Sequence, residues 1–431
     1  MLLAGYLIKK ERIKRNMKQI WLAKNICTVS YLSKIENGQT TASQEILSLL
    51  AKRLDIVTDS FNSHTEDSFI TSLTTFYKEY LTNKNNDGLQ EIINTRNNKY
   101  VFKCRRNYHT YSLLLTRFLL ISNEDMSMIK SEIEFSELLL HEYSTKEKYL
   151  HYLNTCLYKY FDNDFLSAFD YIIKIENIFN ELGLEPWERA DFNYIASLCY
   201  SKIHFFNKAV DFAGQALEYF TNNLFLERAL DCHIIMGNSY KNLADYHNAD
   251  RHLKFALEIT NLLNKRDYLG MLYHNLALLH SRKGFSHIAI EYFKKCLEYK
   301  EERELKSFLL TIYALIKVLY RNRQYEEAKE YCQQGLLLIN QCEMKELYEE
   351  YTNHFTIYTY YIDGNENIKQ ALNTAVDYFG EVNDNWNKGK YTLALAEHYQ
   401  SIGHYKKSAL YYSEFVKAQL EKQSITSWED L

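Results

Sequence analysis

The 431-residue sequence predicts an all-α protein in which a small basic N-terminal domain precedes a long array of helical repeats. Three observations favour this fold class: turn residues are scarce, positive charge gathers near the N-terminus, and small residues recur at a regular period. Only 13 residues are glycine and one, Pro186, is proline, whereas average usage gives about 30 and about 20. Sandwiches and barrels need these residues at tight turns. Long helices joined by short polar corners therefore remain.

The net charge of −4 hides an asymmetry between the two ends of the chain. Residues 1–58 hold ten basic and four acidic side chains, a net charge of +6, which leaves 41 basic and 51 acidic ones, a net charge of −10, for the rest. The small net charge of the whole chain argues against general nucleic-acid or membrane affinity. A basic head on an acidic body predicts that only the head meets a polyanion.

The eight cysteines show no CxxC pair and no spacing to histidines that is typical of zinc sites. Most lie in apolar helical stretches, which favours reduced core residues over redox sensing. We expect no signal peptide, because the apolar start, Leu2–Ile8, precedes its basic residues. The most apolar later stretch, Tyr111–Ser122, is too short to span a bilayer and contains Arg117. These observations predict a cytoplasmic protein without metal or cofactor.

The basic head contains four short apolar runs at helical spacing between Gly5 and Ile56. Their members are Leu7, Ile8 and Ile13; Trp21, Leu22 and Ile26; Leu32 and Ile35; and Ile46, Leu47, Leu50 and Leu54. Thr28 can cap the third helix, since its hydroxyl accepts from amides of the next turn, and Gly38 permits the left-handed stop that ends it. Helices this short must pack into one unit, as in a helix-turn-helix domain.

The run Gln19–Gly38, "QIWLAKNICTVSYLSKIENG", resembles the motif of lambda-repressor-like (XRE) helix-turn-helix regulators, Q-x-x-L-A followed by L-S-x-I-E-x-G. Its variant I-C-x-x-S-x-x-S-x-I-E-x-G resembles the PlcR-type (RRNPP) peptide-pheromone-sensing regulators, the group of Rap, Rgg, NprR, PlcR and PrgX. The resemblance implies that the third helix enters the major groove of DNA. It implies DNA contacts by Gln19, Thr28, Val29, Ser30, Tyr31, Ser33, Lys34 and Asn37. A small helical cap with a solvated basic face is the alternative.

Beyond a polar stretch the helical pattern continues to Gln423, with small residues at a spacing of 37 to 43. These anchors are Ala168, Ala209, Ala249, Ala289, Ala328, Ala371 and Ser408. Further small residues follow seven positions later, on the same helix face, at Ala216, Ala256, Cys296 and Gly335. The units resemble tetratricopeptide (TPR) repeats, about nine in number, of which the first two, in 69–142, are eroded. The expected organisation is a head at 1–58, a linker at 59–68, the array at 69–423 and a tail at 424–431.

The resemblance implies a right-handed superhelix whose concave wall, made by the first helix of each repeat, binds an extended peptide. Asparagine suits this task because its side chain donates and accepts at once. Aligning each repeat on its anchor places seven candidate peptide contacts on the inward side, which are Asn238, Tyr194, His274, Tyr313, Lys317, Asn353 and Tyr360. Asn275 lies beside them, and the resemblance implies that Asn238 and Asn275 are peptide-contacting asparagines. Each of them taken singly can also be an ordinary solvated polar residue.

Enzyme motifs are absent from the sequence: it has no G-x-G-x-x-G, Walker A, G-x-S-x-G or H-E-x-x-H run. The resemblance implies a quorum-sensing transcriptional regulator of a Gram-positive bacterium, a homodimer on a two-fold site in promoter DNA. A short re-imported signalling peptide would control it. Alternatives are an NprR- or Rap-like bifunctional regulator that also binds a response-regulator protein, a peptide-controlled phage or plasmid repressor, and an interaction protein with a vestigial head.

Overall fold

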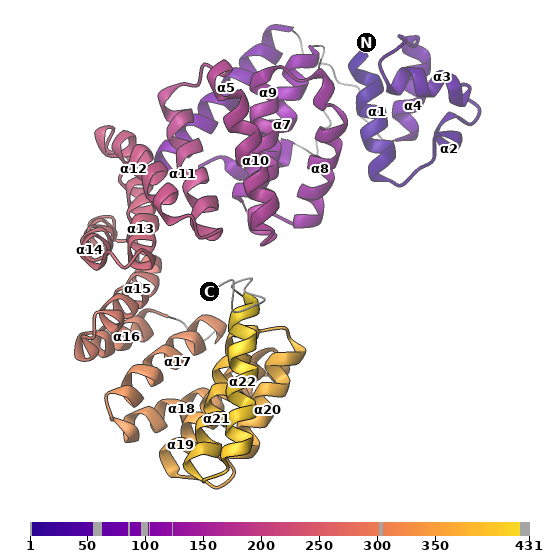
Figure 1. Ribbon diagram of the computed structural model, residues 1–431. Helices are drawn as coiled ribbons and strands as arrows, with labels where there is room; N and C mark the ends of the chain where they lie inside the picture. The colour runs from indigo at the N-terminus through magenta and orange to yellow at the C-terminus, as the bar shows by residue number, and fades with distance from the viewer. Residues whose placement is uncertain are drawn as a thin grey trace. The chain divides into compact units, whose positions relative to one another are not determined.

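All regular secondary structure in the described part of the chain is helical, as the scarcity of glycine and proline predicts (Figure 1). The chain forms two compact units, Met1–Ile259 and Thr260–Leu431. The computed structural model describes residues 2–54, 63–84, 87–95, 102, 104–122, 124–300 and 305–422.

The head folds as four helices, as predicted: α1 (Leu2–Lys14), α2 (Gln19–Ala23), α3 (Val29–Glu36) and α4 (Gln44–Arg53). Their common core contains the fully buried side chains of Leu22, Leu32, Leu50 and Leu54.

The ends of α3 also form as predicted. The Thr28 hydroxyl accepts from the amide of Tyr31 at 3.2 Å, and Gly38 has a φ of 66°. At Gly5 a Cβ atom would lie 2.1 Å from the Ile35 carbonyl oxygen, so α1 and α3 touch through their backbones.

Two members of the expected apolar runs are on the surface instead. The side chain of Trp21 is 61% exposed, and that of Ile13 is also exposed. The second helix has only five residues, so its single buried face is filled by Leu22 and Ala23. Ile26 lies beyond the end of this helix but still packs on the core.

The first unit continues with helices that pack largely in pairs of sequence neighbours. They are α5 (Ser63–Asn83), α6 (Leu89–Asn94), α7 (Arg105–Ile121), α8 (Met126–Leu138), α9 (Thr145–Phe161), α10 (Phe165–Ile178), α11 (Pro186–Lys202), α12 (Phe206–Asn222), α13 (Leu226–Asn242) and α14 (Tyr246–Leu262). The last turn of α14 belongs to the second unit.

The second unit repeats the same pairing of helices. Its helices are α15 (Leu269–Arg282), α16 (Ser286–Tyr299), α17 (Leu305–Arg321), α18 (Tyr325–Gln341), α19 (Glu349–Asp363), α20 (Ile368–Glu381), α21 (Asn385–Ser401) and α22 (Tyr405–Lys422). If α5 and α6 are counted as an incomplete first repeat, the described helices from α5 to α22 make nine pairs.

The expected linker at 59–68 is helical in its second half, because α5 already begins at Ser63. A buried carboxylate explains this start: Glu66 accepts from the amide of Cys104 at 3.0 Å and from the side chain of Asn107 at 3.2 Å. Residues 59–62 and the expected tail, 424–431, lie outside the described residues.

The small anchor residues lie where the period places them. Ala168, Ala209, Ala249, Ala289 and Ala328 are fully buried. The last anchor, Ser408, is buried too, and its hydroxyl donates to the carbonyl oxygen of Ala396 at 2.9 Å.

One anchor is shifted by a residue. Ala371 is only partly buried, and Leu372 occupies the buried position of that repeat. The connection before α20 explains the shift: α19 stops at Gly364 in the left-handed conformation, with a φ of 61°, and the chain turns through Asn367 before α20 begins.

Close helix contacts also occur where small residues return seven positions later. At Gly335 a Cβ atom would lie 2.4 Å from the ring of Phe355, so α18 and α19 can approach this closely only with glycine there. Among the cysteines, Cys232 is fully buried, and burial raises the pKa of its thiol to about 12. This favours the expected role of such cysteines as core residues.

Candidate functional sites in the head and on the inner helices

The outward face of α3 carries the side chains expected to contact DNA. Thr28, Val29, Ser30, Lys34 and Asn37 are exposed, and Tyr31 and Ser33 are half-buried. The opposite face of the same helix, Leu32 and Ile35, is buried in the core. One side of α3 is therefore available to a ligand and the other fixes the helix to the head.

A buried carboxylate braces α3 against the two preceding helices. Glu36 is fully buried and accepts from Arg12 at 2.5 Å (Nε) and 2.7 Å (Nη2), and from the amide of Gln19 at 2.6 Å. Arg12 donates a third bond to the carbonyl oxygen of Met17 at 2.9 Å. The side chain of Gln19, expected at a DNA phosphate, thus has a partner within the head. Glu36 belongs to the helix-turn-helix motif of the sequence, but the motif does not show that Arg12 is its partner.

A second buried ion pair joins the head to the first repeats. The ammonium of Lys10 on α1 lies 2.6 Å from Glu132 on α8, and their side chains are 10% and 1% exposed. The same ammonium lies 5.2 Å from the centre of the Phe135 ring. The sequence predicts an independent head on a linker, and no periodicity identifies this contact.

We call the first helix of each pair its inner helix. On the inner helices of the first unit, buried positive charges have carboxylate partners. Asp191 on α11 accepts from Arg117 on α7 at 2.9 Å and from Arg228 on α13 at 2.8 Å, and all three side chains are buried. Nearby, Lys84 lies 2.7 Å from Asp231. These five residues form what we call the paired network.

Tyr194, an expected peptide contact, belongs to the surroundings of the paired network. The guanidinium of Arg228 lies 4.3 Å from the centre of its ring, and burial raises the pKa of its hydroxyl. Asn238 on α13 is half-buried and accepts from the ammonium of Lys241 at 3.0 Å.

In the second unit, His274 and Asn275 lie half-buried on α15, as expected for residues of an inner helix. A hydrogen bond of 3.1 Å joins His274 Nδ1 to the hydroxyl of Thr311 on α17.

Tyr313 on α17 is the centre of a polar cluster in the second unit. The ammonium of Lys317 lies 4.3 Å from the centre of its ring, and that of Lys390 lies 5.1 Å from it. Lys390 also donates to the Tyr313 hydroxyl at 2.6 Å. The imidazole of His354 stacks on the ring with centroids 4.0 Å apart. Aligning the repeats of the chain on their anchors identifies Tyr313 and Lys317 but not Lys390 or His354.

Asn353 and Tyr360, two of the expected peptide contacts, lie on α19. Both side chains turn toward α20, where they line a hollow of about 410 Å³ together with Gln370. The next residue, His354, is fully buried and stacks on Tyr313 of α17 and on Phe379 of α20.

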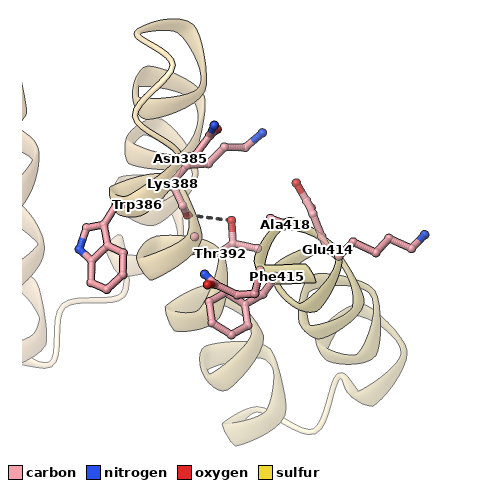
Figure 2. A pocket seen from close by; sticks show the side chains of 10 residues that line it. Asn385, Trp386, Lys388, Thr392, Glu414, Phe415 and Ala418 are labelled. Carbon is pink, nitrogen blue, oxygen red and sulfur yellow. Dashed lines mark hydrogen bonds between the residues drawn. The ribbon is translucent and has the colours of Figure 1, made fainter. Parts of the chain in front are cut away.

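The last helix pair of the array leaves a hollow of about 630 Å³ between α21 and α22 (Figure 2). Phe415 and Thr392 lie on its walls, and the Thr392 hydroxyl donates to the Lys388 carbonyl oxygen at 2.9 Å. Neither Tyr313 nor Lys390 lines this hollow. It arises because no further described helix covers the open face of this pair.

The described ranges contain neither a candidate metal site nor a candidate membrane-spanning helix. Their His, Cys, Asp and Glu side chains nowhere gather in a group of three that could hold a metal ion. None of their helices combines the length and the apolar character needed to cross a bilayer.

Family models match two parts of the chain: a helix-turn-helix model covers residues 8–60, and a tetratricopeptide repeat model covers residues 272–303. Among characterised proteins, the transcriptional activator NprA of Geobacillus stearothermophilus is 28% identical over 396 residues, which are 91% of this chain and 97% of that protein. Response regulator aspartate phosphatase A of Bacillus subtilis is 24% identical over 218 residues, 49% of this chain and 57% of that protein.

Solved structures share the fold. The apo form of the quorum sensor NprR from B. thuringiensis superposes with a TM-score of 0.72 at 21% identity, over 82% of this chain and 99% of that one. NprR in complex with its cognate peptide NprX gives a TM-score of 0.59 at 20% identity, over 83% of this chain and 99% of that one. The comparisons confirm the predicted fold, a helix-turn-helix followed by a TPR-like array.

Proposed function

We propose that the chain, whose fold is a helix-turn-helix followed by a TPR-like array, is a quorum-sensing transcriptional regulator of the PlcR type (RRNPP). Its head binds promoter DNA, and a short signalling peptide bound to the inner helices of the array controls it. NprA, a transcriptional activator, is similar over 91% of the chain. NprR, a quorum sensor with a similar fold, has a cognate peptide.

The observation that carries the proposal is that the exposed face of α3 and the polar inner helices occur together in one chain. Thr28, Val29, Ser30, Tyr31, Ser33, Lys34 and Asn37 are the side chains we assign to DNA. Gln19 acts mainly through Glu36, because its amide is engaged there. The brace on Glu36 orients α3, so that its outward side chains can meet base edges.

A gel-shift experiment at two salt concentrations tests the head, with DNA from upstream of the gene. Tyr31→Ala and Lys34→Ala should each weaken specific binding by about tenfold or more, and Lys34→Ala should also lower the salt dependence. Lys52→Ala, which removes an exposed charge from α4, is the matched control and should have little effect. The assignment of α3 fails if the control weakens binding as much as the two variants.

Calorimetry with peptides encoded by neighbouring small open reading frames tests the array. Asn238→Ala and Asn275→Ala should weaken peptide binding, because each removes a side chain that can both donate to and accept from a peptide backbone. Unchanged affinity in both variants would remove the asparagines from the proposal but leave the peptide in it.

We further propose that the protein is a cytoplasmic homodimer on a two-fold DNA site, because one head supplies few base contacts and paired half-sites lie about one turn apart. Light scattering with and without DNA tests the oligomeric state; a complex with one chain per site would contradict it.

The similarity to a response regulator aspartate phosphatase favours a second candidate function, binding of a response-regulator protein. Co-purification with phosphorylated response regulators distinguishes a bifunctional regulator from a dedicated one.

A further inference from the structure

Three positive charges gather on neighbouring inner helices of the second unit, and we call them the cationic cluster: Lys317 and Arg321 on α17 and Lys390 on α21. Both lysines lie on the ring of Tyr313, with ammonium-to-centroid distances of 4.3 and 5.1 Å. The ring of Tyr358 on α19 also lies 5.4 Å from the Lys390 ammonium.

The cationic cluster has no carboxylate of its own. Across the described residues, neither lysine ammonium lies within 4 Å of an Asp or Glu oxygen. The acidic side chain on the facing turn of α19, Glu350, lies 3.6 Å from His354 Nε2 instead, and Glu397 on α21 is exposed.

Hydrogen bonds do not replace the missing carboxylate. An ammonium has three donors. Lys390 gives one to the Tyr313 hydroxyl at 2.6 Å and one to the Tyr391 hydroxyl at 3.2 Å. No protein acceptor in the described part of the chain meets its third donor or those of Lys317. The cluster is therefore incomplete as a purely structural element.

The pKa values of these groups are consistent with the missing carboxylate. Burial, and then the charge of Lys317, lower the pKa of Lys390 to about 7. Burial and Arg321 also lower the pKa of Lys317. Burial lowers the pKa of His354 to about 4, so the imidazole adds no charge near pH 7. A bound anion would stabilise both ammonium groups.

We propose that Lys317 and Lys390 form a carboxylate subsite for the signalling peptide, a proposal that rests on the proposed function. The carboxylate sits against both ammonium groups, next to the Tyr313 ring. The rings of Tyr313 and Tyr358 lie beside the Lys390 ammonium, and a charge-assisted hydrogen bond is stronger in such a less polar environment than in water. Every peptide with a free C-terminus carries this group, and Asp or Glu side chains supply the same chemistry.

Peptide pools separate these two sources of the carboxylate. The immobilised full-length protein is offered random short peptides in three forms: free C-terminus without Asp or Glu, amidated C-terminus with Asp and Glu, and amidated C-terminus without either. Mass spectrometry measures how much of each peptide form is retained. Enrichment of the first form identifies a C-terminal carboxylate, and enrichment of the second an acidic side chain. Either result supports the subsite.

Single substitutions assign the effect to the cationic cluster. Lys317→Gln and Lys390→Gln should each lower retention of the preferred form by about tenfold, whereas Lys406→Gln, which removes an exposed charge from α22, should not. The comparison of the three peptide forms on the unsubstituted protein tests the preference for a carboxylate even if a variant folds poorly.

Two results would overturn the proposal, and they can be told apart. Equal retention of all three forms removes the subsite but leaves a peptide-binding array. Retention of none removes peptide binding itself, and the subsite with it.

Discussion

The two units of the chain bury positive charge in opposite ways. In the first unit Asp191 accepts from both Arg117 and Arg228. In the second, Lys317 and Lys390 share one tyrosine ring, and among the described residues no carboxylate lies within 4 Å of either ammonium. A buried charge that has its counter-charge holds helices together, since removing the partner leaves an uncompensated charge. A half-buried charge without one reduces stability until a ligand supplies the partner, as is common at functional sites.

The largest expected effect is the loss of the carboxylate in the paired network. Asp191→Asn keeps the shape of the side chain but leaves Arg117 and Arg228 buried without a counter-charge. We expect the free energy of unfolding to fall by about 3–5 kcal/mol, measured by urea unfolding followed by circular dichroism. Asp211→Asn, an exposed change on α12, is the control. Equal stability of the two variants would show that the network does not stabilise the unit.

The second largest effect is expected from substitution of Glu36, the buried carboxylate that braces α3 in the head. Glu36→Gln removes the charge that Arg12 contacts at 2.5 and 2.7 Å, at a cost of about 2 kcal/mol. Hydrogen exchange in the full-length protein should then be about 30-fold faster at the amides of α3. Glu45→Gln on α4, which is exposed, should leave exchange unchanged. Unaltered exchange in Glu36→Gln would contradict the role of the brace.

Substitution in the cationic cluster should act in the opposite direction. Lys390→Met keeps the apolar stem and removes the ammonium. In the absence of peptide we expect it to raise the free energy of unfolding by about 0.5–2 kcal/mol, measured by urea unfolding. A clear loss of stability would mean that the ammonium is a structural group, like those of the paired network.

The last expected effect is on the pH dependence of stability. Lysine in the unfolded chain has a pKa of about 10.4, whereas Lys390 in the folded protein has a pKa of about 7. Between pH 7 and about pH 9 the unfolded state therefore binds more protons, and stability should rise with pH. This rise should be smaller in Lys390→Met than in the unsubstituted protein. Identical slopes in urea unfolding would indicate that Lys390 titrates normally.

The sequence predicts the fold well, because helical periodicity and small-residue anchors are local features. The four head helices and the cap at Thr28 form as predicted, and six of the seven anchors are buried. The start of α5 was missed, since it depends on bonds from Cys104 and Asn107 to Glu66, which are distant in sequence.

The inner side chains were harder to predict for a similar reason. One altered connection before α20 moves the buried anchor position from Ala371 to Leu372. Lys390 reaches Tyr313 across 77 positions of sequence. A repeat period gives the position of a residue on its helix, but it does not give the partner on another helix.

Titration of Lys390 itself tests the central contrast most directly. NMR of isotope-labelled lysines in the full-length protein, with the Lys390 signal identified by its loss in Lys390→Gln, gives the midpoint. In the peptide-free protein we expect a midpoint near pH 7, moving upward when a retained carboxylate peptide is added. An ordinary midpoint above pH 10 that no peptide shifts would contradict the account.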